Sequence, residues 1–206
     1  MPENWRGSLL ANDFRANRTV RYELKEEGSG YTAKEVQTVL HSSHRSFRPV
    51  DIKMGPDGAV YVVDWYNPII DHGEVDFHHP FRDKAHGRIW RLVAEGRPLL
   101  KREPIAKTTP PALLDLLKSP AQYNRVQARR ELAGHEPAKL LPLIKKWVGA
   151  LDQKDPDYEH HRLEGLWLAV ATRANYPELA LEVLRSPSPQ ARAGACLLYT
   201  SPSPRD

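Results

Sequence analysis

Up to about residue 100, apolar and polar residues alternate with a period of two, which is the pattern of half-buried β-strands. The alternating or apolar runs lie at 20–24, 31–40, 50–54, 59–63 and 88–93. Turns rich in glycine separate several of them, and the Gly-Pro-Asp-Gly sequence at 55–58 is a strong hairpin signal. The pattern therefore predicts an all-β region of several short strands.

Two stretches of this region resemble each other. Residues 7–14 align with residues 58–65, and each is followed by an alternating strand that ends in Glu-Gly. Self-similarity at a spacing of about 50 residues is typical of β-propeller blades. We therefore predict an incomplete propeller of about two blades over residues 1–98, with its neighbouring blades absent.

From Pro110 onward the apolar period is helical. Two apolar residues followed by a basic residue, serine and proline occur at 116–120 and again at 183–187. Helix pairs that recur every ~30 to 40 residues are typical of HEAT-like solenoids. The predicted fold class is thus a partial β-propeller, a proline-containing linker at 99–109, and HEAT-like helical repeats at 110–195.

Both ends of the sequence have unusual features. Residues 196–206 resemble the translation of a sequencing-library adapter, so we expect a non-native tail there. The single cysteine, Cys196, lies in this tail, and we expect no disulfide or cysteine-ligated metal before it. Residues 1–5 lack the basic and apolar regions of a signal peptide, and strand-like sequence begins almost at once, so the start is expected to be internal to a longer protein.

Charge and composition narrow the function classes. The chain has 30 Lys and Arg against 26 Asp and Glu, a formal net charge of +4, and the basic residues are scattered. Nucleic-acid binding requires basic residues concentrated on one face, so we do not expect it. No uncharged apolar run approaches the ~20 residues that a transmembrane helix needs, and no transmembrane segment is expected.

The connection after Asp64 is unusually long. After Asp13 the chain returns to strand by Arg18, whereas after Asp64 it does so only near Gly87. Loops of this length without regular structure are usually functional or disordered. Because the 55–58 turn occupies one end of its hairpin, the residues before 50 and after 63 meet at the other end. Arg48 and Asp51 are therefore predicted to lie beside this loop.

The loop is rich in chemically active side chains, and four interpretations remain open. It contains His72, His78, His79 and His86, together with four acids and several cations. The histidines and carboxylates suit a transition metal. Asp51, Asp64 and Asn67 offer oxygen ligands for Ca²⁺. A histidine base beside arginines that hold an anionic cofactor suits hydride transfer. In the fourth interpretation, Asp64, His86 and Arg88 only hydrogen-bond the loop to its neighbours.

An ordered series of residues resembles a known family. The series is Phe47-Arg48-Pro49-Val50-Asp51, Gly55-Pro56-Asp57-Gly58, Asp64-Trp65-Tyr66-Asn67-Pro68 and His86-Gly87-Arg88-Ile89-Trp90-Arg91. It is similar to the PVC-type membrane-bound dehydrogenases, also called PVC-type haem-binding proteins. The resemblance implies a quinoprotein-like dehydrogenase of the periplasm or cell envelope, which oxidises a sugar or alcohol and passes electrons to a c-type haem domain.

The resemblance also implies roles for residues and cofactors. Pyrroloquinoline quinone and Ca²⁺ are the implied cofactors, and the chain has no Cys-x-x-Cys-His motif of its own for haem. The implied catalytic base is His72 or His86, and the implied metal ligands are Asp64 and Asn67. The residues expected to bind cofactor or substrate are Arg48, Asp51, Trp65, Arg82, Asp83 and Arg88.

Two other functions compete with the dehydrogenase. One is a non-catalytic scaffold in which the loop recognises a carbohydrate or a protein. The other is a Ca²⁺-dependent hydrolase such as a lactonase. The dehydrogenase hypothesis requires a small sugar or alcohol substrate and an electron-transfer partner.

Overall fold

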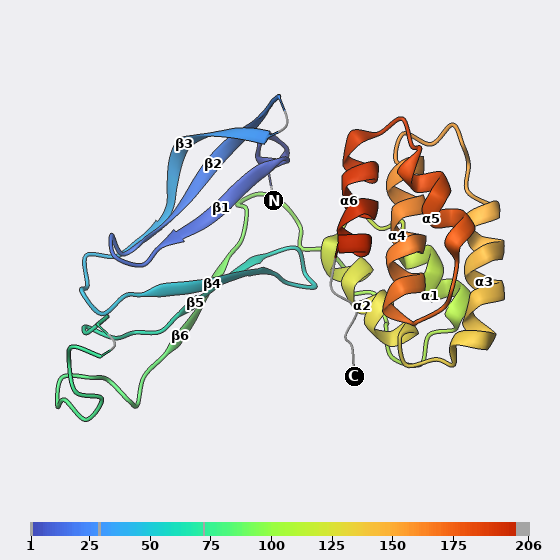
Figure 1. Cartoon of the computed structure of the whole chain (residues 1–206). Helices are drawn as coiled ribbons and strands as arrows, with labels where there is room; N and C mark the ends of the chain where they lie inside the picture. Colours follow the sequence, from blue (N-terminus) through green and yellow to red (C-terminus); the bar gives the residue numbers. More distant parts are fainter. Residues whose placement is uncertain (1, 29, 72, 201–206) are drawn as a thin grey trace. The chain divides into compact units, whose positions relative to one another are not determined.

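The computed structural model describes residues 2–28, 30–71 and 73–200, and the chain divides into two compact units (Figure 1). The first unit is Met1–Arg102 and the second is Glu103–Asp206. The first contains the strands, and the second contains the helices.

The first unit consists of two three-stranded antiparallel sheets with the orders β1-β2-β3 and β4-β5-β6. Its elements are η1 (Glu3–Trp5), β1 (Ser8–Asp13), β2 (Arg18–Glu27), β3 (Gly30–His41), β4 (Pro49–Met54), β5 (Val60–Asp64) and β6 (Arg88–Leu92). The strands therefore lie where the period-two runs predicted them, with β1 added from the repeated stretch.

The β4–β5 turn shows why the 55–58 sequence forms a hairpin. Gly58 has a φ of +75°, a conformation that side chains disfavour. A Cβ atom on Gly55 would lie 2.2 Å from a ring carbon of Tyr61, so no larger residue fits there. Asp57 closes the turn by accepting hydrogen bonds from the backbone N–H of Ala59 and the hydroxyl of Tyr61. This turn fixes the register of β4 on β5.

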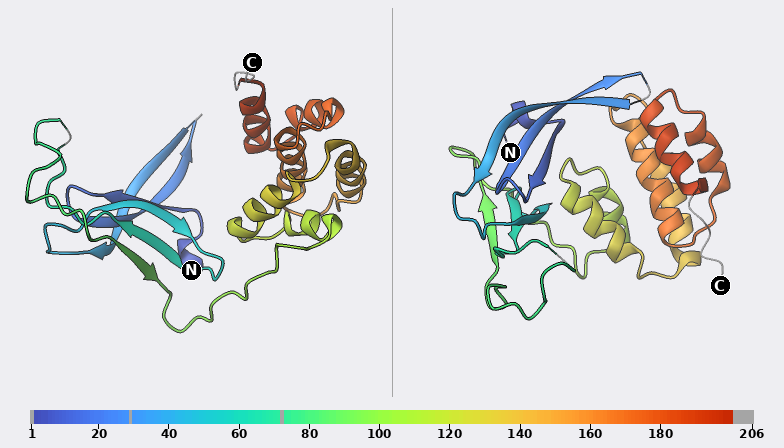
Figure 2. Two further views of the ribbon diagram at one scale, coloured as in Figure 1. Left: turned by 90° about the horizontal axis from the view of Figure 1, so that it is seen from below. Right: turned by 60° about the vertical axis from the view of Figure 1, so that its left-hand side comes forward.

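Residues just before β4 connect the two sheets. Phe47 is buried, and its ring packs edge-on against Trp90 of β6. The side-chain amide of Asn17, in the β1–β2 turn, donates to the backbone carbonyl of Phe47. β1 also lies next to β4 (Figure 2). The small core of this unit is completed by Val20, Ala59, Val60 and Val62.

The second unit is a group of six helices around one apolar core. The helices are α1 (Pro110–Leu116), α2 (Gln122–Leu132), α3 (Pro137–Gly149), α4 (Tyr158–Ala171), α5 (Pro177–Leu184) and α6 (Pro189–Thr200). Proline stands in the first turn of α1, α3 and α5, where its missing N–H costs nothing. Each of the six helices contributes to a single cluster of buried side chains, with Leu113, Ala128, Ile144, Leu168, Leu179 and Ala191 among them.

The predicted fold class is wrong. In the part of the chain that the structure describes, two small three-stranded sheets are followed by six α-helices, and this arrangement is neither a propeller nor a solenoid. The long segment after β5 leads into β6, the third strand of its sheet, whereas a propeller blade typically has four strands. The helices share one core, whereas solenoid repeats contact only their neighbours. Internal self-similarity at this spacing is therefore also compatible with two small consecutive sheets.

The C-terminal part of the chain remains helical beyond residue 195. Helix α6 continues through Cys196 to Thr200, and the cysteine is exposed. The rest of the suspected tail, 201–206, lies outside the described residues. Within the described residues, no helix combines the length and hydrophobicity needed to cross a bilayer.

Candidate functional site

Asp64, the last residue of β5, organises the start of the long loop. Its side chain is fully buried, and Oδ1 accepts hydrogen bonds from the backbone N–H groups of Arg48 (2.8 Å) and Tyr66 (2.9 Å). Its Oδ2 accepts a hydrogen bond from the indole N–H of Trp90 at 3.2 Å and lies 3.8 Å from Nη1 of Arg88. A buried carboxylate is stable only when it is paired and hydrogen-bonded, and here both conditions hold.

Arg48 is the buried cation of this network. Its Nε donates to the carbonyl of Asn67 at 3.1 Å, and its Nη1 donates to the carbonyl of Phe14 at 2.8 Å. Its own carbonyl accepts from the backbone N–H of Trp65. Burial lowers the pKa of the guanidinium. Arg48 thus holds the loop against the β1–β2 turn.

Asn67 joins the two ends of the loop. Its side-chain oxygen accepts from the backbone N–H of Ile69, and its side-chain NH₂ donates to the carbonyl of Asp83 at 3.1 Å. This bridge brings the segment that carries Asp83 and His86 close to the end of β5.

Arg82 folds the middle of the loop on itself. Its guanidinium donates to three backbone carbonyls, those of Asp71, Val75 and Asp76, and packs over the ring of Phe77. Through Nε and Nη2, Arg82 therefore ties three backbone carbonyls of the loop together.

His86 and Asp83 form an oriented pair. Nδ1 of His86 lies 2.8 Å from Oδ2 of Asp83. Asp83 Oδ1 also accepts from the backbone N–H groups of Ala85 and His86, at 2.9 and 2.8 Å. These two groups, with the ring of His86, hold the pKa of Asp83 below its usual value. Since a carboxylate only accepts, Nδ1 of neutral His86 carries the proton and Nε2 carries the lone pair.

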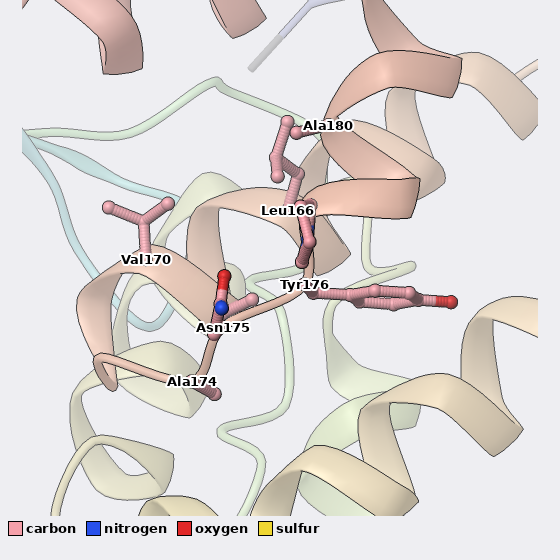
Figure 3. A pocket seen from close by; sticks show the side chains of 8 residues that line it. Leu166, Val170, Ala174, Asn175, Tyr176 and Ala180 are labelled. Carbon is pink, nitrogen blue, oxygen red and sulfur yellow. The ribbon is translucent and has the colours of Figure 1, made fainter.

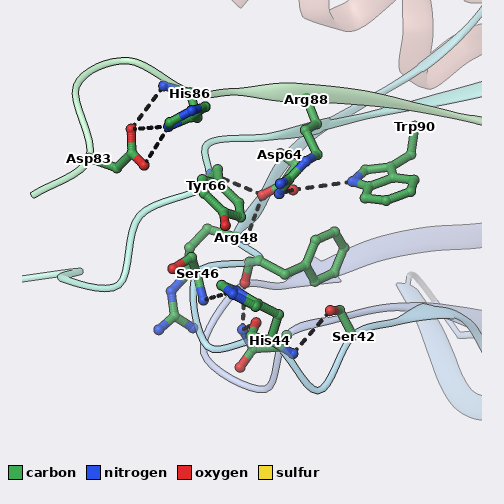
Figure 4. A network of polar contacts seen from close by, with 12 residues as sticks. Ser42, His44, Ser46, Arg48, Asp64, Tyr66, Asp83, His86, Arg88 and Trp90 are labelled. Atoms are coloured by element: carbon green, nitrogen blue, oxygen red, sulfur yellow. Dashed lines mark hydrogen bonds and ion pairs between the residues drawn. The ribbon is translucent and has the colours of Figure 1, made fainter.

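Tyr66 is the centre around which the exposed side chains gather (Figure 4). Its φ is +53°, a conformation that is rare for an aromatic residue. The guanidinium of Arg88 lies 3.8 Å from the centre of its ring. The ring of His44 stacks on it at 5.4 Å, and the ring of His86 meets it edge-on at 5.9 Å. We call Tyr66, His44, His86 and Arg88 the Tyr66 cluster.

The oxygen atoms expected to bind Ca²⁺ are already used. Both oxygens of Asp64 and the side-chain oxygen of Asn67 accept hydrogen bonds from protein donors. Asp51 is exposed on β4, where Lys53 and the backbone N–H of Ile52 lower its pKa. No group of three or more His, Cys, Asp or Glu residues within the described ranges is arranged to hold a metal. These residues therefore do not fit a Ca²⁺ site.

The three arginines expected to hold an anionic quinone also do not form a cradle. Pyrroloquinoline quinone carries three carboxylates, yet Arg48 and Arg82 are engaged with backbone carbonyls. Arg88 alone of the three has no hydrogen bond among the described residues; its ionic partner is Asp64 at 3.8 Å. These three arginines therefore do not fit the three carboxylates of this cofactor.

The structure brings together six of the predicted site residues: Arg48, Asp64, Asn67, Asp83, His86 and Arg88. Asp51 and Arg82 lie in separate contacts, and Trp65 joins the group only through its backbone. His72 lies outside the described residues. Sequence reasoning missed Tyr66 and His44, because a ring contact between residues 22 positions apart leaves no spacing signal.

The helical unit contains an apolar cavity of about 220 Å³ between α4 and α5 (Figure 3). Its lining residues are Leu166, Ala169, Val170, Ala174, Asn175, Tyr176, Pro177 and Ala180. None of these side chains is a strong acid, a base at neutral pH or a nucleophile, so the lining of the cavity offers no group for catalysis at neutral pH.

Comparison with known proteins gives one match. Residues 1–96 are similar to a family described as a domain of unknown function (DUF7133). No curated protein and no solved structure matches the chain. The matched range includes all six strands and the whole Tyr66 cluster.

Proposed function

We propose that this chain is part of a dehydrogenase that oxidises a sugar or an alcohol, with His86 as the proton acceptor. The observation that carries the proposal is the His86–Asp83 pair. Asp83 contacts Nδ1 of His86, so the lone pair of neutral His86 is on Nε2, which does not take part in this contact. The side chain of His86 is 66% exposed, so a substrate hydroxyl has access to it. A positioned histidine base typically contributes ~10²- to 10⁴-fold to a proton-transfer step.

In the proposed reaction, this chain accepts one proton. The carbinol carbon loses a hydride to a soluble two-electron acceptor of the quinone class, and its hydroxyl proton passes to Nε2 of His86. The products are a carbonyl compound, the reduced acceptor anion and an imidazolium. Asp83 stabilises that imidazolium through Nδ1, as a carboxylate orients the histidine of a catalytic triad.

Other parts of the proposal rest on the resemblance to PVC-type dehydrogenases. These are export to the periplasm or cell envelope and the transfer of electrons to a c-type haem partner. The resemblance is carried by the residues around Arg48, Asp64 and His86, which are the residues that the structure joins in one network.

Dye-linked oxidation of a panel of sugars and alcohols tests the proposal. The wild-type protein and the His86→Ala variant are both assayed, and the folding of each is checked by circular dichroism. We expect at least a ~100-fold loss of turnover in the variant. His78→Ala is the matched control, because it removes an exposed histidine of the same loop and should keep full turnover. Unchanged turnover in His86→Ala refutes the base assignment.

Exposed aromatic side chains favour a second candidate, the non-catalytic recognition of carbohydrate. Phe77 and Phe81 of the loop are 65% and 68% exposed, and the Arg82 contacts hold their segment in place. Aromatic rings give large contact areas at low entropic cost, so they are suited to the apolar face of a sugar ring. Glycan binding that is lost in Phe77→Ala, without oxidation of any sugar, supports this candidate over the dehydrogenase.

A further inference from the structure

Arg88 is the arginine of the Tyr66 cluster, and its ionic partner is Asp64, 3.8 Å away. In the same unit, Arg48 and Arg82 donate to backbone carbonyls, and Arg91 donates to Asp57. Arg88 instead lies over the ring of Tyr66, with its guanidinium carbon 3.8 Å from the ring centre, and among the described residues its guanidinium makes no hydrogen bond. Stacking fixes the plane of a guanidinium and leaves its edge free for a planar anion.

The two histidines of the cluster present opposite chemistry. Nδ1 of His44 accepts from the backbone N–H of Ser46 at 3.2 Å, so the proton of neutral His44 is on Nε2. Nδ1 of His86 faces a carboxylate, so neutral His86 has its lone pair on Nε2. In Figure 4, Arg88 and His86 lie toward the upper side of Tyr66, and His44 lies below it. His44 stacks on the ring of Tyr66, and Arg88 and His86 both contact the same ring, which places these two side chains in one cluster.

From this juxtaposition we infer that the Tyr66 cluster binds hydroxy carboxylates, with a hydroxyl at Nε2 of His86 and the carboxylate at the guanidinium edge of Arg88. The inference deepens the proposed function and rests on it for the oxidation step. It narrows the substrate class from sugars and alcohols in general to acidic sugars and related hydroxy acids.

The charges around the cluster favour a single negative charge. Asp64 lies 3.8 Å from Arg88 and offsets part of its charge, but as a buried acceptor it leaves the outer edge of the guanidinium unoccupied. The carboxylate of Asp83 is turned toward the N–H group of Ala85 and Nδ1 of His86, with which it forms hydrogen bonds. Within the Tyr66 cluster, Arg88 is the arginine that can receive a ligand carboxylate, so a second negative charge on the ligand would have no arginine there and would lie near Asp64 and Asp83. Arginine also matches the planar geometry of a carboxylate through two parallel hydrogen bonds.

Titration of the chain with D-glucuronate, D-glucuronamide and L-lactate, followed by NMR, tests the inference. Glucuronamide keeps the sugar ring and its hydroxyls but lacks the charge. We expect glucuronate to bind at least about fivefold more tightly than the amide, with shifts at Tyr66, His86 and Arg88. Weaker binding of lactate than of glucuronate indicates an acidic sugar, and comparable binding of the two indicates a small hydroxy acid; both outcomes support the carboxylate at Arg88.

Arg88→Gln should abolish the preference for glucuronate over glucuronamide. Arg91→Gln is the matched control: it removes the same charge three residues along β6, where Arg91 pairs with Asp57, and should leave the preference unchanged. Equal affinity for glucuronate and glucuronamide in the wild-type chain overturns the inference. So does a preference that persists in Arg88→Gln.

Dye-linked oxidation separates this inference from the proposed function. Turnover of neutral sugars without any preference for the acid refutes the substrate class and leaves the dehydrogenase proposal standing. Binding of glucuronate that depends on Arg88, without oxidation of any tested compound, confirms the site and refutes the dehydrogenase proposal.

Discussion

Replacement of Asp64 by alanine should open the junction between the two sheets and the long loop. The carboxylate is fully buried and is the acceptor for the N–H groups of Arg48, Tyr66 and Trp90. Asp64→Ala leaves these three donors without their acceptor. It also removes the ionic partner of Arg88.

The magnitude follows from the three donors. A buried donor that loses its partner costs about 1 to 3 kcal/mol. The hydrogen bond from Arg48 is buried and those from Tyr66 and Trp90 are partly buried, so the variant should lose about 3 kcal/mol of local stability. That is a large fraction of the ~5 to 15 kcal/mol that stabilises a typical domain. The Asp64→Asn variant should lose less stability than Asp64→Ala, because the amide keeps one acceptor oxygen. It should still be less stable than the wild type, because its NH₂ group faces either Trp90 or the two backbone donors.

Amide hydrogen exchange measured by NMR gives the most local readout. We expect the protection of the Arg48 and Tyr66 amides to fall about 100-fold or more in Asp64→Ala. Asp51→Ala is the control, because its exposed carboxylate on the same sheet should change stability by no more than about 0.5 kcal/mol. Unchanged exchange at Arg48 and Tyr66 in Asp64→Ala refutes the structural role of this carboxylate.

Three further predictions concern other contacts. Arg82→Gln should raise protease cleavage within 73–82 about fivefold, because three carbonyls lose their donor; equal cleavage rates contradict this. Glu164→Gln should destabilise the helical unit by about 3 kcal/mol in urea unfolding, since Glu164 is buried against Arg129 and Arg125. Burial lowers the pKa of His161, so the unfolded chain takes up this proton first, and the helical unit should lose stability as pH falls below 6.5. A melting temperature that is constant from pH 8 to pH 5.5 disagrees with that sign.

The sequence predicted the strands well because their signals are local. The alternation at 20–24 and 50–54 and the turn at 55–58 act over a few residues, and each appears in the structure as expected. The repeat of 7–14 at 58–65 led to the wrong fold class. Similar short strands arise wherever two small sheets follow each other, and the number of strands in each sheet depends on contacts that the repeat does not encode.

The candidate site was predicted in part. A polar residue at the end of a buried strand indicated Asp64, and the position of Arg48 beside the loop followed from hairpin geometry. Whether such a residue binds a ligand or the protein's own backbone depends on donors from distant segments, such as Trp90 for Asp64 and three loop carbonyls for Arg82. The sequence does not display these partners, so the hydrogen bonds that Arg48, Asp64 and Arg82 make within the chain could not be predicted from it.

The tautomer of His86 tests the proposed chemistry most directly, since that chemistry needs a lone pair on Nε2. Two-bond ¹H–¹⁵N correlation spectra of the neutral imidazole report which nitrogen is protonated. We predict the proton on Nδ1 in the wild-type chain and a change in this preference in Asp83→Asn. A proton on Nε2 in the wild-type chain would contradict the role of His86 as the base.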